Sequence, residues 1–326
     1  MESDIGKLLE AAEKGEAKAQ MSLAYSYLMG DGKGFSDGTK WELAATDHGL
    51  MDAQFVIGLM YETGITRGDL QIAPNDAKAL EWYQKAADQG KIQAQYRVGL
   101  MYEEGRGTQY NLKEAIRWYR QAAEKGETEA QFKLGHMSEL GQGIPTDDVK
   151  AFEWYLKAAK RDLPEAQFRV GWMYETGRGV GQDEIEALVW YRKASANKVA
   201  QATLRIGFMY EHGSCVLKNV DKAIDLYILA AGQGAPQAVD ACAKLAEQGN
   251  VKAQFRLGRL YAEGIGVPKD DAQAANWYMK AAEQGDPDAQ FIIGTLLFSG
   301  NGVKQDMEKG NRWIEESLKL PKKSGK

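Results

Sequence analysis

Small and apolar residues recur along the chain with a period close to 36 positions. The clearest marker is an alanine, found at Ala19, Ala53, Ala94, Ala130, Ala166, Ala202, Ala238, Ala253 and Ala289. The successive spacings are 34, 41, 36, 36, 36, 36, 15 and 36 residues. A glycine follows most of these alanines after five and after eleven positions, and a tyrosine often follows after eight. Such self-similarity indicates a repeat protein in which each segment is one supersecondary unit.

Each repeat predicts two helices. Counted from the alanine, positions 0, 4, 7, 8 and 11 share one face at 100° per residue, which is the pattern of an amphipathic first helix. The glycine eleven positions on predicts the end of this helix, because glycine adopts the left-handed conformation at little cost. Second helices are predicted to begin after residues whose side chains can cap the free N–H groups of the first turn. These capping residues are Asn75, Asn111, Asp147, Asp183, Asn219, Asp270 and Asp306.

Four short elements recur in this frame: Ala-Gln-Phe, Met-Tyr-Glu-x-Gly, Trp-Tyr-x-Lys-Ala-Ala and Gln-Gly. Together they resemble the Sel1-like repeat (SLR) family, a relative of the tetratricopeptide solenoids, from about Ile5 to Lys319. The resemblance implies an all-α fold, a right-handed α/α superhelical solenoid of about eight to nine helix-turn-helix repeats. It also implies that the first helices line a concave side and that the protein is an interaction scaffold. Stacking agrees with this, because one helix pair cannot bury its apolar face alone.

The chain is predicted to be a single solenoid over residues 1–326, with three departures from the regular repeat. Residues 1–15 predict a lone N-terminal cap helix before a long repeat block over 16–234. Within that block a spacing of 41 against 36 lengthens the connection Ile65–Ala73, which is expected to protrude. Residues 235–249 predict a degenerate unit of one helix, with a change in the superhelical path, because the spacing there is 15. Repeats resume over 250–320, and the polar tail 321–326 is expected to be disordered.

Composition and charge narrow the classes of function. With 44% hydrophobic and 27% charged residues, the chain has the composition of a folded protein. A net charge of −5 disfavours a general nucleic-acid binder, which needs a basic excess. Two cysteines, Cys215 and Cys242, cannot build a disulfide framework, so a reducing compartment is expected. No secretory signal or membrane span is visible, which predicts a cytoplasmic location, or a periplasmic one if a signal has been removed.

No catalytic, cofactor or metal site is predicted. The histidines His48, His136 and His212 have no metal-ligand spacing. The glycine run from Gly177 to Gly181 follows a helix, whereas a dinucleotide site needs a preceding strand. A glutamate recurs nine positions after the alanine, and we call this set the glutamate column: Glu62, Glu103, Glu139, Glu175 and Glu211. Because it recurs in successive units one turn before the helix end, we interpret it as structural or solvated rather than catalytic.

A candidate binding surface lies three and six positions after the alanine, where residues vary while the repeat frame is kept. Both positions lie away from the core face of the first helix. Ten residues there form what we call the first-helix stripe: Arg97, Leu100, Lys133, His136, Arg169, Trp172, Arg205, Phe208, Arg256 and Arg259. Large apolar groups beside arginine are typical of a binding hot spot. Trp172 is the one tryptophan that the repeat frame does not explain. The competing interpretation is a solvated basic face.

The stripe predicts a protein or peptide partner that is acidic and partly hydrophobic. The leading hypothesis is a non-catalytic adaptor or scaffold that holds this partner along the concave face. The alternative is a dedicated inhibitor or immunity-type protein that blocks one enzyme or toxin, with contacts at an edge or at the long connection Ile65–Ala73. An RNA partner is disfavoured because the nearby glutamates would repel phosphate. An enzyme would need a constellation that the repeat frame does not explain, and the sequence shows none.

Overall fold

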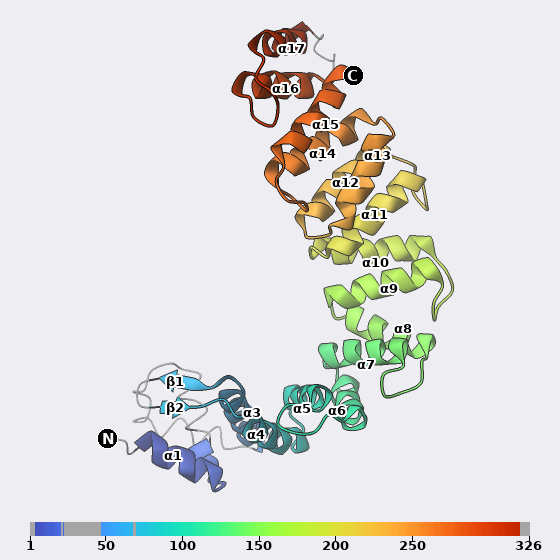
Figure 1. The fold of residues 1–326 in the computed structure, drawn as a ribbon. Helices are drawn as coiled ribbons and strands as arrows, with labels where there is room; N and C mark the ends of the chain where they lie inside the picture. The colour runs from blue at the N-terminus through green and yellow to red at the C-terminus, as the bar shows by residue number, and fades with distance from the viewer. Residues whose placement is uncertain (1–3, 21, 23–46, 68–69, 320–326) are drawn as a thin grey trace. The chain divides into compact units, whose positions relative to one another are not determined.

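The computed structural model describes residues 4–20, 22, 47–67 and 70–319 (Figure 1). The predicted tail 321–326 and the side chain of His48 lie outside the described residues. The described part is helical apart from one short hairpin, and helices alternate as the repeat predicts, which confirms the α-solenoid fold class. Contacts divide the chain into two compact units, Met1–Leu163 and Pro164–Lys326. This division falls between two regular repeats, not at the single-helix segment 235–249.

In its described residues, the first unit contains helix α1 and three helix pairs. Helix α1 spans Asp4–Glu13, and residues 17–20 are also helical. The pairs are α3 (Asp47–Thr63) with α4 (Asp76–Asp88), α5 (Ile92–Glu104) with α6 (Leu112–Glu124), and α7 (Thr128–Leu140) with α8 (Asp148–Ala159). Within the unit, α4 also packs against α5, and α6 against α7. The unit is therefore held together by contacts between neighbours in sequence.

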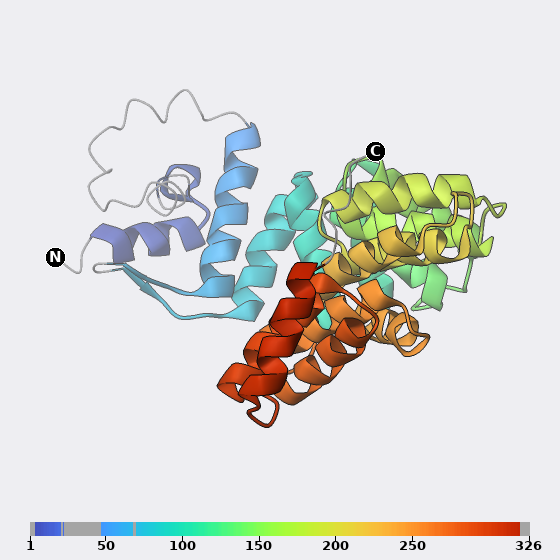
Figure 2. The ribbon, with the colours of Figure 1, turned by 90° about the horizontal axis from the view of Figure 1, so that it is seen from above.

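The long connection after α3 forms a β-hairpin, which the sequence did not predict. Strand β1 (Ile65–Arg67) pairs antiparallel with β2 (Leu70–Ile72), with Ile65 opposite Ile72. Figures 1 and 2 show the hairpin extending away from the α3–α4 pair, so the connection protrudes as expected. The buried Ile72 side chain ties its base to the neighbouring core.

Over residues 164–319, the second unit contains four helix pairs and one additional helix. The pairs are α9 (Pro164–Thr176) with α10 (Glu184–Ala196), α11 (Ala200–His212) with α12 (Val220–Gly232), α14 (Val251–Glu263) with α15 (Asp271–Glu283), and α16 (Pro287–Ser299) with α17 (Met307–Lys319). The additional helix, α13 (Gln237–Glu247), lies where the sequence predicts one helix in place of two. It packs against both α12 and α14, and α12 also contacts α14.

The predicted helix ends are confirmed. All seven capping side chains accept from backbone N–H groups of the following turn, as when Asn75 accepts from the N–H of Lys78 at 3.0 Å. The C-cap glycines of five first helices are left-handed, with φ from 69° at Gly105 to 81° at Gly213. Each end therefore has partners for backbone groups that would otherwise be unpaired.

In every described helix pair except α16–α17, the core contains a tyrosine ring packed on a glycine. Tyr83, Tyr119, Tyr155, Tyr191 and Tyr227 of the second helices are fully buried. Each ring lies directly on the glycine five positions after the alanine. A Cβ atom on Gly207 would lie 2.5 Å from the Tyr227 ring, closer than packed carbon atoms can approach. In α13 the same position is Ala243, and the helix packs through small and aliphatic residues instead.

Candidate functional site

The glutamate column lies at the junction between the two helices of each repeat. The buried tyrosine of the second helix donates its hydroxyl to the glutamate of the first. The pairs are Tyr83 with Glu62 (2.6 Å), Tyr119 with Glu103 (2.5 Å), Tyr155 with Glu139 (2.7 Å), Tyr191 with Glu175 (2.5 Å), and Tyr227 with Glu211. The column is therefore structural, as its regular recurrence suggested.

Burial and the carboxylate acceptors keep these tyrosines protonated. Burial is the larger cause that raises the pKa of Tyr83, Tyr119, Tyr191 and Tyr227, and the hydrogen bond to glutamate raises it further. Tyr278 in α15 has Ala262 in place of the column glutamate, and burial raises its pKa to about 12. The hydroxyl groups of the column are thus held as hydrogen-bond donors at neutral pH.

Three cations of the first-helix stripe also bind the glutamate column. Each reaches back from its own first helix to the glutamate of the preceding repeat. The pairs are Arg97 with Glu62 (3.4 Å), Lys133 with Glu103 (3.0 Å) and Arg205 with Glu175 (3.5 Å). Each glutamate therefore joins a tyrosine of its own repeat to a cation of the next. The cations remain 31% to 40% exposed, so they still reach the surface.

The remaining stripe cations are placed differently. Arg256 on α14 lies 3.7 Å from Asp225 of α12, which also binds Lys252 at 2.8 Å. Arg259 is 51% exposed and pairs with Glu263 of its own helix at 2.7 Å. Arg169 on α9 is half-buried. The stripe is thus a surface of cations whose charge is partly offset by acidic neighbours, rather than a row of free positive charges.

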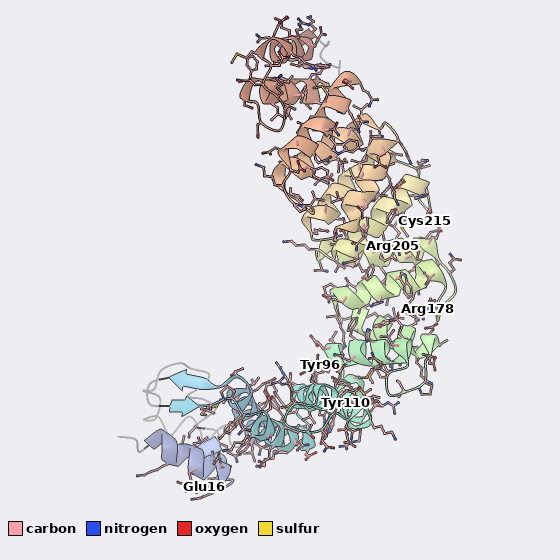
Figure 3. The ribbon with its side chains drawn as sticks, in the orientation of Figure 1. Glu16, Tyr96, Tyr110, Arg178, Arg205 and Cys215 are labelled. Atoms are coloured by element: carbon pink, nitrogen blue, oxygen red, sulfur yellow. The ribbon has the colours of Figure 1, made fainter. Side chains whose placement is uncertain are left out.

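The apolar members of the stripe are half-buried. Leu100 packs against the core of the α5–α8 region, and His136 on α7 is similarly covered. Trp172 packs beside the cluster around Tyr191, with the guanidinium of Arg178 5.0 Å from its ring centroid. The Phe208 ring contacts Tyr227 with ring centroids 5.5 Å apart. Figure 3 labels Arg178 and Arg205 in this part of the second unit. Part of each aromatic surface is used by the fold, and the rest is exposed.

A pocket in the second unit escaped the sequence analysis. Its volume is about 420 Å³, and it lies where α13 replaces a helix pair. Its lining comes from the end of α11, the start of α12, the end of α13 and the turn before α14. These residues are Glu211, His212, Lys218, Val220, Leu245, Gln248, Gly249 and Asn250. The spacing of 15 residues was the one sign of this pocket in the sequence. It means that one helix of a pair is missing, and with it side chains that would pack near Glu211.

Neither a metal cluster nor a membrane span is found in the part of the chain that the structure describes. There, three or more histidine, cysteine, aspartate or glutamate side chains nowhere gather closely enough to bind a metal ion. No described helix combines the length and apolar character needed to cross a bilayer.

The repeat matches a known family across most of the chain. The Sel1 repeat matches residues 17–40, 52–91, 92–127, 128–163, 164–199, 200–234, 251–286 and 287–320. The chain belongs to the Sel1 repeat family. The unmatched interval 235–250 contains α13, the one helix of the second unit outside a Sel1 repeat pair.

Solved Sel1 repeat structures show the same fold. The chain is similar to c5321, a protective antigen with an SLR fold present in uropathogenic Escherichia coli strains, with 30% identity and a TM-score of 0.58 over 96% of this chain and 79% of that one. It is also similar to a Sel1 repeat protein from Oxalobacter formigenes, with 30% identity and a TM-score of 0.55 over 96% of this chain and 85% of that one. A search of curated proteins found no match.

Proposed function

We propose that this Sel1 repeat protein is a non-catalytic scaffold that binds a partner polypeptide along the first-helix stripe. The observation that carries the proposal is the pairing of aromatic and cationic groups on α9 and α11. Trp172 and Phe208 occupy the same repeat position, are partly exposed, and each follows an arginine by three residues. Partly exposed aromatic groups beside arginine are the composition that dominates binding energy at protein interfaces.

The chemistry of the stripe indicates the partner. Arg205 is 40% exposed, and its one ion pair among the described residues, with Glu175 at 3.5 Å, leaves most of its five N–H donors available. A carboxylate of the partner can share this guanidinium, while Trp172 and Phe208 contribute apolar area. The partner segment is therefore proposed to be acidic and partly hydrophobic. Cys215 and Cys242 are free thiols, which supports a reducing compartment such as the cytoplasm as the place of binding.

Affinity capture with matched variants tests this scaffold role. The Trp172→Ala, Phe208→Ala double variant removes the exposed aromatic groups of the stripe. The control, Ile185→Ala with Leu229→Ala, removes exposed apolar groups from the second helices α10 and α12. We expect quantitative mass spectrometry to show at least a tenfold loss of a specific partner from the stripe variant only, on the order expected for a hot spot. Equal recovery by all three proteins would contradict the proposal.

A third variant separates the scaffold from a blocking inhibitor. Replacing residues 65–73 by a short glycine-serine connection removes the protruding hairpin and leaves the stripe unchanged. A scaffold that uses the stripe retains its partner in this variant. Loss of the partner here, with retention in the stripe variant, would favour an inhibitor that binds through the hairpin.

A further inference from the structure

Among the described residues, Glu211 lacks the cation that Glu62, Glu103 and Glu175 bind. Glu62, Glu103 and Glu175 each accept a tyrosine hydroxyl and bind a cation from the next first helix. Glu211 accepts the hydroxyl of Tyr227, but no cation among the described residues forms an ion pair with it. Its carboxylate is half-buried and lines the pocket at the end of α11.

The single-helix unit explains this difference. Three positions after Ala238, where a regular repeat carries arginine or lysine, α13 carries Ala241, which is buried and apolar. The next regular first helix is α14, and it does supply the cation Arg256. That guanidinium lies against Asp225 of α12, 3.7 Å away, because α12 and α14 are in direct contact. The cation that would complete the junction has therefore been redirected to another carboxylate.

The pocket that results has the features of a side-chain site. Glu211 supplies a negative charge whose protein partner is a neutral hydroxyl. Val220 and Leu245 supply apolar wall, and Gln248 and Asn250 add amide groups. An aliphatic stem with a charged head fits such a lining, because the stem packs on apolar groups while the head reaches the carboxylate. Lys218 also lies on the wall and is exposed, so its ammonium opposes a second cation.

We propose that this Glu211 pocket binds one arginine or lysine side chain of the partner polypeptide. The charged head takes the place that Arg97, Lys133 and Arg205 take at the other glutamates. The inference rests on the proposed scaffold function and refines it. Glu211 follows Phe208 by three residues on α11, so one bound segment that contacts Phe208 also reaches the pocket. The proposed partner segment is therefore acidic and apolar where it contacts the stripe, and it carries one basic residue that contacts Glu211.

A titration of the full-length protein tests the pocket without knowledge of the partner. The probe is Nα-acetyl-arginine amide, and its control is Nα-acetyl-citrulline amide, which has the same shape without the charge. Binding is followed by ¹H–¹⁵N NMR at the backbone amides of Gln248, Gly249 and Asn250. We expect saturable shifts at these amides with the arginine probe and binding about three- to fivefold weaker, or weaker still, with the citrulline probe.

Variants make the test specific to the carboxylate. Glu211→Gln retains an acceptor for Tyr227 and removes the charge, and it should weaken binding of the arginine probe about three- to fivefold, as expected for a partly exposed ion pair. Lys218→Ala should strengthen binding. Glu247→Gln removes an exposed carboxylate at the end of α13, next to the pocket lining but not part of it, and should leave binding unchanged. Equal binding of both probes, or an unchanged affinity in Glu211→Gln, would overturn the proposal.

Failure of the pocket and failure of the scaffold role give different results. If the pocket proposal is wrong, the arginine probe does not bind, while partner capture still depends on Trp172 and Phe208. If the scaffold proposal is wrong, capture is insensitive to the stripe variant even where the probe binds with the expected dependence on Glu211.

Discussion

The regular repeats and the single-helix unit build the same stack by different means. In the α9–α12 region, Gly171 receives the Tyr191 ring, and Glu175 joins that tyrosine to Arg205. In α13 the corresponding positions for glycine and cation are Ala243 and Ala241. Yet α13 buries Val239, Leu245 and four small residues and packs against both neighbours. Apolar burial is therefore enough to hold a helix in the stack. The tyrosine–glutamate–cation junction is a further interaction found in regular repeats.

The two regions also differ in the residue that contacts the end of the preceding helix. In several regular repeats a buried glutamine follows the alanine and donates to a carbonyl eight residues earlier. Gln131 donates to Ala123 at 2.9 Å and Gln254 to Ala246 at 3.0 Å. The equivalent position in α13 is Val239. Such repeats thus contact the preceding helix through a directed hydrogen bond, whereas α13 has an apolar side chain at this position.

The largest difference in stability between the two regions is expected at the glycine beneath the tyrosine ring. Gly207→Ala places a Cβ atom 2.5 Å from the buried Tyr227 ring, so we expect a loss of about 2–3 kcal/mol from the free energy of unfolding. In an ordinary helix position the same change would stabilise by up to about 1 kcal/mol. The reverse change in α13, Ala243→Gly, should cost only about 1 kcal/mol, its helix-propensity cost. Urea denaturation of the two variants measures both values, and a stabilised Gly207→Ala would refute the tight packing.

A smaller effect is expected at the hydroxyl of the junction tyrosine. Tyr191→Phe leaves Glu175 without its 2.5 Å hydrogen bond, which should cost about 1–2 kcal/mol, because a partly buried carboxylate loses a donor. The matched variant is Tyr278→Phe. The Tyr278 hydroxyl forms no hydrogen bond within the described residues, so its removal should cost less than about 0.5 kcal/mol. Equal costs in urea denaturation would mean that the glutamate junction contributes nothing to stability.

The same tyrosines predict an alkaline dependence of stability. The pKa of Tyr191 is raised in the folded protein, chiefly by burial, so its contribution is fully present below the ordinary tyrosine pKa near 10. It is lost as the pH rises above that value, because the unfolded chain then releases a proton that the folded chain retains. In Tyr191→Phe the decline of the unfolding free energy between about pH 10 and pH 12 should be shallower, by up to about 1.4 kcal/mol per pH unit. Denaturation at several pH values measures this slope.

The smallest expected effect lies in the loop that leads from α11 toward the Glu211 pocket. Cys215, labelled in Figure 3, has a φ of 49°, whereas the same loop position in other repeats is a left-handed glycine, such as Gly179 at 70°. Cys215→Gly should relieve this strain and stabilise the protein by about 0.5–1 kcal/mol, after allowance for the added freedom of the unfolded chain. Gly179→Ala is the mirror control and should destabilise by a similar amount. Thermal unfolding in the presence of a reductant measures both, and a destabilised Cys215→Gly would show that the Sγ contact with the Glu184 carbonyl at 3.3 Å matters more.

The sequence predicted the helices and their boundaries because these depend on residues that are close together in the chain. Helix ends at Asn111 or Gly141 depend on residues within one turn, and the spacing of 15 residues was sufficient to locate α13. The hairpin at Ile65–Ile72 was missed because its pairing depends on a turn that no repeat column describes. The stripe positions were found from helical periodicity. Their ion pairs were not, because Arg205 and Glu175 are 30 residues apart and meet only through the stacking of two repeats.

The glutamate junction has a consequence for how such a chain can change length. Each join is completed by groups within one 36-residue period and the start of the next. Duplication or loss of one whole period therefore restores the same glutamate junction between the repeats on either side, and the same core residues can pack there. An insertion or deletion that is not a multiple of the period leaves a helix that still stacks but a glutamate without its cation. Helix α13 and Glu211 show this arrangement. In this architecture, an incomplete repeat also opens a pocket in the stack, as it does beside Glu211.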